Sequence, residues 1–215
     1  MDSAMSIAIA AFTIIAFATI LILISGKKSS HSKSNLKQKN RATIIRECTK
    51  KLAHNPHNIQ ALKPLAELYY SEHLWDKALP LYDTLSNIAS RHPEIEIGET
   101  NLKQGICLVK LGKAQEATQK LIIALKSNPT SYEANLFLGK SLFKLNNFEK
   151  AIPLLKKALS LNPEASGVYQ PLGLACYKAH MFKEAIQYLR RALDENPEDK
   201  EALYTLADSM QECGF

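Results

Sequence analysis

Hydrophobic and polar positions follow a helical period through most of the chain, and this pattern itself repeats at a fixed distance. The stretch NFEKAIPLLKKALSLNP (147–163) returns at 181–197 as MFKEAIQYLRRALDENP, with the apolar, small and proline positions kept and the charges changed. Each repeat holds two segments with apolar residues at helical intervals, joined by a short turn and closed by a proline that stops the second helix. One helix pair cannot bury its apolar side alone, so the pattern predicts several pairs stacked around a shared core.

The small and apolar positions recur together from unit to unit. In the most regular unit they are Tyr169, Leu172, Gly173, Cys176, Ala185, Leu189 and Pro197. This set resembles the signature of the tetratricopeptide repeat (TPR) family, which spreads a large residue, Leu-Gly, an aromatic or apolar residue, Ala, an aromatic residue or Leu, and Pro over about 34 residues. The resemblance covers roughly residues 59–212 and implies an all-α fold, a right-handed superhelical solenoid of helix-turn-helix pairs. Four positions depart from the signature, namely Asn101, Gln104, Asn135 and, at the place of the closing proline in the first unit, Ser90.

The repeat also sets the expected domain boundaries. A TPR domain at 59–215 would contain units near 59–97, 98–131, 132–165 and 166–199 and a terminal helix at 200–212. The first of these units is longer than the three that follow it. The segment RATIIRECTKKLAHNP (41–56) is expected to form a lead-in helix that covers the first unit. The terminal helix either caps the array or marks the point where further repeats would follow.

The beginning of the chain is apolar in a different way. Residues 5–24, MSIAIAAFTIIAFATILILI, contain no charge, proline or glycine. Twenty helical residues span about 30 Å, the thickness of a bilayer's hydrocarbon core. A cleaved signal peptide would have a positive start and an apolar run of roughly 7–15 residues. Asp2 is the only charged residue before this longer run, so residues 1–25 are predicted to be a retained transmembrane anchor.

Charge next to this anchor predicts its orientation. From Lys27 to Lys51 the net charge is +8, whereas from Leu52 onward it is −1. Because Lys and Arg beside a membrane segment favour the cytoplasmic side, we expect the amino terminus outside and the TPR domain in the cytoplasm, with a bacterial inner membrane as the leading setting. Residues 26–40 are expected to be a basic flexible linker, with adhesion to anionic lipid headgroups as the alternative. No aromatic residues interleave these charges, so nucleic-acid binding is not expected.

The sequence assembles no recognisable active site. A Gly-Lys-Ser at 139–141 lacks the strand and the glycine-rich loop of a phosphate-binding site. His54 and His57 flank a proline in a polar turn without a third ligand nearby. Cys107 and Cys176 fall inside amphipathic helices, where a buried thiol acts as a small apolar group. No enzyme activity, cofactor or metal is predicted.

The remaining candidate is the concave groove, which in the TPR family is lined chiefly by the first helix of each unit. The resemblance places the following residues on it: Lys63, Glu67, Tyr70, Leu102, Ile106, Val109, Leu136, Lys140, Phe143, Gln170, Leu174 and Tyr177. Lys110, Lys144 and Lys178 recur at the same place in successive units and are called the lysine ladder below. An apolar strip edged by lysines would suit a peptide with hydrophobic anchors and acidic flanks. The alternative interpretation is structural, because a lysine near the end of a helix complements its dipole.

One subtype of the family can be tested directly. TPR proteins that grip the acidic carboxyl ends of heat-shock chaperones use five side chains: Lys and Asn, then Asn, then Lys and Arg. The matching positions hold Lys63, Glu67, Lys103, Glu133 and Phe137. Only the first fits, and Glu67 would repel the ligand's carboxylate. That clamp is not expected here.

The sequence therefore predicts a membrane-tethered scaffold whose TPR groove recruits a protein or peptide partner. Bacterial envelope assembly or secretion is the leading setting, by analogy with anchored members of the family. Two alternatives remain open. One is an import-type receptor on the mitochondrial outer membrane, and the other is an array that associates with copies of itself.

Overall fold

A computed structural model describes residues 40–214, so the predicted anchor (5–24) and nearly all of the predicted linker (26–40) lie outside the described residues. Within 40–214, no helix is long and apolar enough to cross a membrane. By its contacts the chain divides into two units after Lys50. A helix occupies residues 40–54 and ends two residues before the predicted boundary at 56. It ends there because Pro56 disfavours a helical backbone at Asn55, whose side-chain oxygen instead accepts a hydrogen bond from the His57 amide at 3.0 Å.

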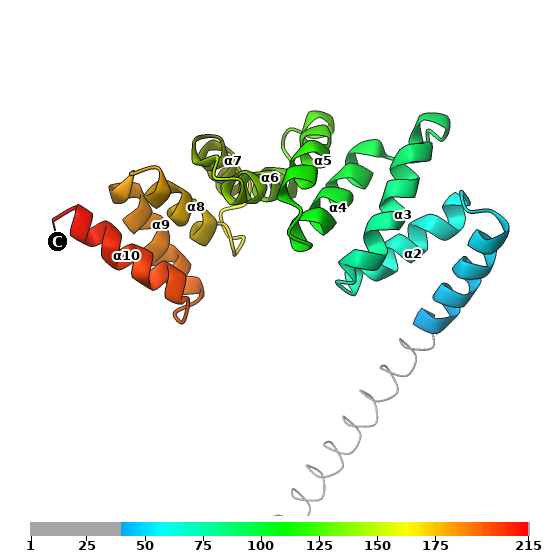
Figure 1. The fold of residues 1–215 in the computed structure, drawn as a ribbon, viewed down its shortest axis with the longest axis horizontal. Coiled ribbons are helices and arrows are strands. Elements are labelled where there is room, and N and C mark those ends of the chain that lie inside the picture. Colours follow the sequence, from blue (N-terminus) through cyan, green and yellow to red (C-terminus); the bar gives the residue numbers. More distant parts are fainter. Residues whose placement is uncertain (1–39, 215) are drawn as a thin grey trace, which may run out of the picture. The chain divides into compact units, whose positions relative to one another are not determined.

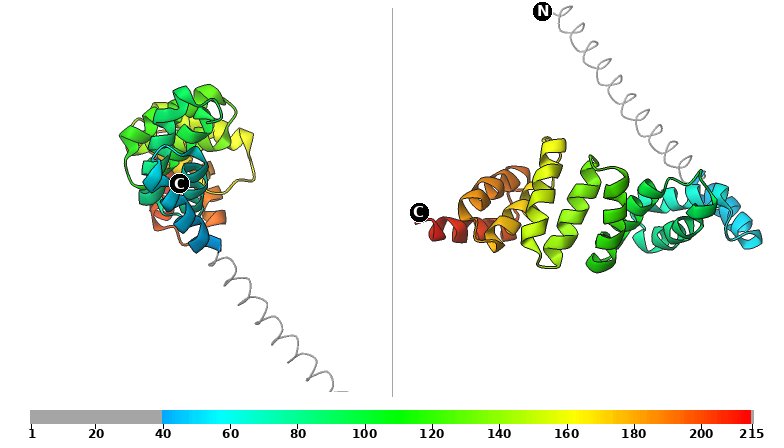
Figure 2. Two further views of the ribbon diagram at one scale, coloured as in Figure 1. Left: turned by 90° about the vertical axis from the view of Figure 1, so that its right-hand side faces the viewer. Right: turned by 90° about the horizontal axis from the view of Figure 1, so that it is seen from above.

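The unit that follows Lys50 is a succession of helix pairs, and residues 51–214 contain no strand. The pairs follow one another in chain order from α2 to α10 (Figures 1 and 2). Within each pair the two helices pack together, and α10 packs on α9 and α8. The all-helical repeat architecture is therefore confirmed. The elements are α2 (Ile59–Ser71), α3 (Trp75–Ile88), the short 3-10 helix η1 (Ala89–Arg91), α4 (Ile97–Lys110), α5 (Ala114–Ser127), α6 (Tyr132–Lys144), α7 (Phe148–Leu161), α8 (Tyr169–Lys178), α9 (Phe182–Glu195) and α10 (Lys200–Glu212).

Polar side chains define where several first helices begin. Asn58, Ser131 and Asp199 precede α2, α6 and α10, and each accepts a hydrogen bond from the backbone amide three residues later at 3.1–3.2 Å. Such a cap satisfies one of the amide donors that lack a partner in the first turn. The starts of these helices therefore follow from local chemistry before any packing is considered.

The two helices of a pair approach closely at one glycine. A Cβ atom placed on Gly139 of α6 would lie 2.7 Å from Cγ of Leu155 in α7. Gly105 and Gly173 meet Leu121 and Leu189 in the same way. This is the packing reason for the Gly and Leu positions that recur from unit to unit.

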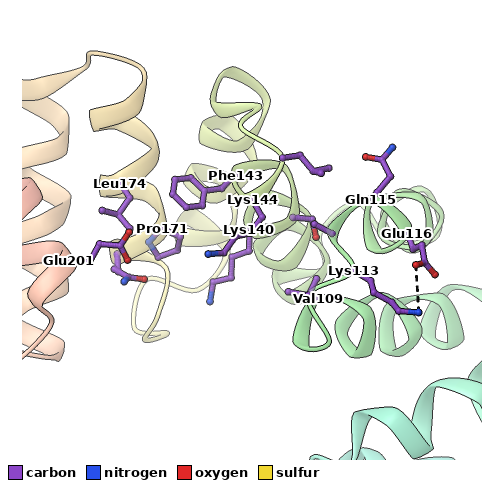
Figure 3. Close-up of a pocket in the computed structure, with 15 residues that line it drawn as sticks. Val109, Lys113, Gln115, Glu116, Lys140, Phe143, Lys144, Pro171, Leu174 and Glu201 are labelled. Atoms are coloured by element: carbon purple, nitrogen blue, oxygen red, sulfur yellow. Dashed lines mark ion pairs between the residues drawn. The ribbon is translucent and has the colours of Figure 1, made fainter.

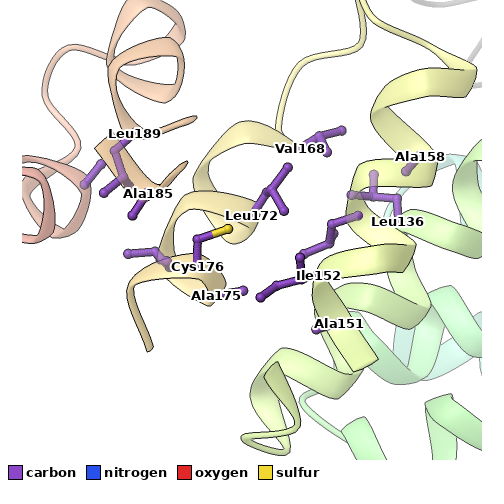
Figure 4. Packing of buried hydrophobic residues seen from close by; sticks show 13 residues of the cluster. Leu136, Ala151, Ile152, Ala158, Val168, Leu172, Ala175, Cys176, Ala185 and Leu189 are labelled. Atoms are coloured by element: carbon purple, nitrogen blue, oxygen red, sulfur yellow. The ribbon is translucent and has the colours of Figure 1, made fainter. Parts of the chain in front are cut away.

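Neighbouring pairs share their apolar cores. Around α6 to α9, Leu136 and Ile152 lie in one buried cluster with Leu172 and Leu189 (Figure 4). Cys176 belongs to this cluster and is fully buried, and burial raises the pKa of its thiol to about 11. Cys107 is likewise buried, in the cluster of the first unit, with a pKa raised by burial to about 12. Both thiols are protonated at neutral pH and act as small apolar groups, as predicted.

The greater length of the first unit corresponds to an extra segment between α3 and α4. It holds η1 and a turn in which Ile95 is only 4% exposed. Ile95 joins the cluster of the first unit, so the additional residues pack against the array. The backbone oxygen of Glu94 in this turn accepts a hydrogen bond from the Lys63 ammonium at 2.7 Å.

Candidate protein-binding groove

A cavity of about 720 Å³ opens between α6 and α8 (Figure 3). It also touches the end of α4, the start of α5 and one residue of α10, so five helices contribute to it. In Figure 3 the ring of Phe143 lies between α6 and α8 on the side of Leu174 and Pro171. Six of the predicted groove residues line this cavity: Val109, Lys140, Phe143, Lys144, Gln170 and Leu174.

Some predicted groove residues belong to the core instead of the surface. Ile106 and Leu136 are 4% and 5% exposed, and neither lines the cavity. Their side chains are buried in the core and are not available to a ligand in this cavity. Leu174 is as buried, at 4%, yet it does reach the cavity wall.

The predicted groove residues of the first unit already have partners within the protein. Lys63 donates to the backbone of Glu94. Glu67 accepts hydrogen bonds from the Tyr82 hydroxyl at 2.9 Å and from the Lys103 ammonium at 2.6 Å. Lys103 also pairs with Glu99 at 2.9 Å. These internal bonds satisfy the charges of this end of the groove.

Tyr70 is held in the same region by aromatic packing. Its ring makes edge contacts with Trp75 and Tyr82, at centroid distances of 5.3 and 6.1 Å. The Lys103 ammonium lies 5.8 Å from its centroid. Burial, together with nearby negative groups, raises the pKa of the Tyr70 hydroxyl far above its ordinary value. Tyr70 therefore acts as a neutral packing residue over the working pH range.

The middle of the array is different, because Lys110, Lys140 and Lys144 lack carboxylate partners there. The ammonium groups of Lys110 and Lys140 lie 5.8 and 5.7 Å from the centroid of the Phe137 ring. Lys140 is half-buried, and burial together with the neighbouring charge of Lys110 lowers the pKa of its ammonium group, against the opposite influence of Glu195. No ion pair within residues 40–214 engages Lys110, Lys140 or Lys144.

The lysine ladder is not brought together in one place. Lys144 lines the cavity between α6 and α8, and Lys110 reaches Phe137 beside it. Lys178 lies 5.5 Å from the ring of Tyr177 and lines a different cavity, of about 660 Å³, with Phe148 and the turn before α9. Of the other predicted groove residues, Leu102 lines a third cavity, and the Tyr177 hydroxyl is 3.5 Å from Asp208.

Several residues of the cavity were not among those predicted. Beside the cavity, Phe137 follows a predicted residue directly, and the ammonium groups of Lys110 and Lys140 lie near its ring. Glu201 reaches the cavity from α10, and Lys113 and Glu116 from the start of α5, where they form an ion pair at 3.7 Å. The resemblance placed only residues of the first helix of each complete unit on the groove. It could not identify Lys113, Glu116 and Glu201, because α5 is a second helix and α10 lies beyond the last complete unit. Within residues 40–214 no group of three or more His, Cys, Asp or Glu side chains is placed to hold a metal ion.

Comparison with known proteins fits this architecture. Two models of the tetratricopeptide repeat match the chain, over residues 102–166 and 177–214. Residues 102–166 and 177–214 are tetratricopeptide repeats. A search of curated protein sequences finds no match to it.

Solved structures of TPR proteins resemble this one in fold. A crystal structure of MamA aligns with a TM-score of 0.60 and 22% identity, covering 72% of this chain and 82% of MamA. A second MamA structure gives 0.60 and 23%, covering 77% of this chain and 95% of that one. YrrB, described as "a TPR protein with an unusual peptide-binding site", aligns with a TM-score of 0.62 and 21% identity, covering 78% and 84% of the two chains. At these sequence identities the similarity shows a shared fold and nothing about function.

Proposed function

We propose that this TPR protein is a membrane-tethered scaffold that recruits a protein partner through an extended segment bound in its groove. A TPR array is an interaction scaffold and carries out no catalysis. The observation that carries the proposal is the cavity between α6 and α8. It combines an apolar wall with Lys140 and Lys144, which form no ion pair within residues 40–214.

The proposed tether is the apolar segment at residues 5–24. With the basic residues that follow it, this segment would hold the TPR domain on the cytoplasmic side of a membrane. Tethering raises the effective concentration of anything the groove captures near that membrane. A bacterial inner membrane, with a role in envelope assembly or secretion, is the setting we propose.

The mode of binding draws support from a protein of the same fold. YrrB is a TPR protein with a peptide-binding site, at 21% identity to this chain. Peptide capture is therefore compatible with this architecture, and the cavity of about 720 Å³ falls in the size range of ligand sites, roughly 300–1,000 Å³.

A second function is favoured by one observation on α10. Its side chains Leu203 and Tyr204 are 46% and 73% exposed, which is unusual for large apolar groups. Exposed apolar helix faces associate, so this face could join copies of the chain. An import-type receptor for basic presequences is less suited to the groove, because unpaired lysines would repel such a ligand.

Site-specific photocrosslinking in native membranes tests the proposal. A photoreactive residue at Phe143 of the full chain faces the cavity, and one at Lys157, exposed on α7 and outside the cavity, is the matched control. We expect one protein to crosslink at Phe143 and not at Lys157, and the crosslink to weaken when Lys144 is changed to Glu. Equal crosslinking at both positions, or capture of copies of the chain alone, would contradict groove recruitment.

The tether has its own test. Deleting residues 5–24 should move the protein from the membrane pellet to the supernatant after alkaline extraction. Continued sedimentation of the deleted form would show that the basic segment or the TPR domain holds it at the membrane instead.

A further inference from the structure

We propose that the cavity between α6 and α8 recognises an acidic peptide segment. Its carboxylate is held by Lys140 of the lining together with Lys110, which lies outside the lining beside Phe137, and its apolar side chain packs against Phe143 and Leu174. This inference rests on the proposed groove function and specifies its ligand. The occupant is an extended stretch of a protein partner that carries Asp or Glu next to Leu or an aromatic residue.

The first step is a contrast among the lysines of the array. Lys103 is neutralised by Glu67 and Glu99 at 2.6 and 2.9 Å. Lys156 is neutralised by Glu184 at 2.5 Å. In these two cases the chain supplies a carboxylate from another helix. Lys140 and Lys144 of the lining, and Lys110 beside it, form no ion pair within residues 40–214. Glu195 acts on Lys140 only at longer range, so these lysines remain open to the carboxylate of a ligand.

The second step concerns the positions of these unpaired charges. Lys140 and Lys110 both lie within 5.8 Å of one aromatic ring, that of Phe137. The ammonium of Lys140 is also near the backbone at Gly167, since a Cβ atom there would lie 3.9 Å away. The lysine is therefore confined between α6 and the start of α8. A carboxylate that enters this space would meet the half-buried ammonium of Lys140, whose freedom is already reduced, and the exposed ammonium of Lys110 near the same ring. The reduced freedom of Lys140 lowers the entropy cost of binding.

The third step is the strength of the contact. Charge-assisted hydrogen bonds are shorter and stronger than neutral ones. They also strengthen away from bulk water, and Lys140 is half-buried. Burial and the charge of Lys110 lower the pKa of Lys140 in the free protein, against the influence of Glu195. A carboxylate of the ligand would relieve the repulsion between Lys140 and Lys110. A basic or neutral ligand would gain none of this.

The apolar half of the site gives the ligand its second feature. Val109, Phe143, Pro171 and Leu174 line the same cavity as Lys140 (Figure 3). Apolar pockets with a few placed polar groups bind a side chain by burial and orient it by charge. The ligand should thus combine an acidic residue with an apolar neighbour, and a purely acidic peptide should bind less well.

Glu201 is a negative residue of the cavity that would repel an acidic ligand. Removing its charge should therefore raise the affinity, whereas removing a lysine should lower it. Glu201 of α10 lines the cavity and forms no ion pair with any residue in 40–214. The other acidic group of the lining, Glu116, is paired with Lys113. Glu201→Gln should therefore tighten binding of an acidic peptide, whereas Lys140→Met and Lys110→Met should weaken it.

The experiment begins by selecting peptides from a random twelve-residue display library on the full chain in nanodiscs of neutral phosphatidylcholine, with empty discs as the control. We expect enrichment of peptides that join Asp or Glu to Leu or an aromatic residue. Fluorescence anisotropy with one enriched peptide then measures affinity. We expect about a tenfold loss for Lys140→Met, a smaller loss for Lys110→Met, and a gain of about twofold to fivefold for Glu201→Gln. Lys157→Met, on the exposed side of α7, should leave the affinity unchanged.

The outcomes separate this inference from the function on which it rests. Enriched peptides that are basic or neutral, yet lose binding when Phe143 is changed to Ala, would overturn the acidic ligand and leave groove recruitment standing. Enriched acidic peptides whose affinity is the same for wild type, Lys140→Met and Glu201→Gln would also overturn it. Absence of any enrichment over empty discs would overturn both. Thermal melting of each variant shows whether a lost affinity reflects lost folding.

Discussion

Lys140 is a residue whose proposed role in binding would oppose folding. Its ammonium group is half-buried, has no ion pair within residues 40–214, and lies near the charge of Lys110. We expect Lys140→Met to raise the melting temperature by roughly 1–3 °C, since 1 kcal/mol corresponds to about 2–4 °C in a domain of this size. Circular dichroism of the full chain in detergent measures this, and Lys157→Met is the exposed control. A lower melting temperature would mean that Lys140 supports the fold.

The same lysine predicts a dependence on pH. Burial and Lys110 lower its pKa in the folded state below the ordinary value of 10.5, and Glu195 acts against them. The folded state therefore disfavours the proton, and the cost is fully present below the folded pKa. It disappears as the pH rises from the folded pKa towards 10.5. The stability difference between Lys140→Met and wild type should be largest near pH 7 and should shrink towards pH 10.5. A difference that stays constant with pH would contradict this account.

Gly139 tests the closest approach within a helix pair. Alanine is the better helix former by about 1 kcal/mol, but its Cβ would lie 2.7 Å from Leu155, which is fully buried and cannot move aside. Overpacking of this kind costs about 1–3 kcal/mol, so we expect Gly139→Ala to lower the melting temperature by several degrees.

A double variant distinguishes the steric clash from other causes. Leu155→Ala alone should cost about 2–5 kcal/mol, because it leaves a cavity in the core. In that background Gly139→Ala should cost little or restore some stability, since the clashing atoms are gone. Additive losses in the double variant would rule out the clash.

Residue-level inference from the sequence succeeded where the register of the repeat holds and failed where contacts cross it. The register placed Phe143, Lys144 and Leu174, and these residues do line the cavity. It gave no sign that Lys103 pairs with Glu67, because these residues lie 36 positions apart across the irregular first spacing. It also left open how the polar exceptions are accommodated. The structure buries Asn101, Gln104 and Asn135 and leaves each with an oxygen that has no hydrogen-bond partner.

At the scale of the element, the helix ends could be predicted better from some residues than from others. Gly112 and Asn146 adopt a left-handed backbone, with φ of 77° and 58°, in the turns between paired helices, and both residue types tolerate this conformation. His73 and His180 take the same conformation with φ of 59°, although histidine is a weak signal for it. There the hydrogen bonds of the helix end fix the turn, as in the bond of 2.8 Å from the Met181 amide to Cys176. Local hydrogen bonds thus impose what the residue type does not specify.

Proline inside α7 leads to the prediction at this scale. Pro153 is the sixth residue of the helix, so its missing amide would have donated to the carbonyl of Glu149. The equivalent position in α9 is Gln187. Pro153 is exposed, so little packing depends on its ring. We expect Pro153→Gln to stabilise the protein by about 1–2 kcal/mol, which is less than the full helix penalty of proline because the unfolded chain gains freedom.

The reverse exchange in α9 is the matched control. Gln187→Pro removes an amide from a helix that has all of its own, and it should cost about 3 kcal/mol or more. Both variants can be compared by chemical denaturation followed by far-ultraviolet circular dichroism. A loss of stability in Pro153→Gln would show that α7 needs the local geometry that proline imposes.

At the scale of the whole molecule, the main contacts within residues 51–214 join neighbouring or next-neighbouring helices. The buried residues accordingly form three successive clusters, around α2 to α4, α4 to α6 and α6 to α10. The stability of such an array is approximately a sum of terms within units and between neighbours. Net charge is also unevenly distributed along the sequence, at +8 from Lys27 to Lys51 and −1 from Leu52 onward.

This linear order predicts where damage to one unit will be felt. Leu155→Ala weakens the core of the third unit, and its effect should pass to the adjoining helices through shared clusters. Hydrogen exchange followed by mass spectrometry should show the largest acceleration in α6, α7 and α8. Amides of α2 and α3, whose cluster contains no residue beyond Cys107, should change least. Equal acceleration in every helix would mean that the array opens as a single cooperative body. In that case a ligand bound between α6 and α8 would stabilise α2 as strongly as α7, whereas in a linear array its protection should decline with distance from the cavity.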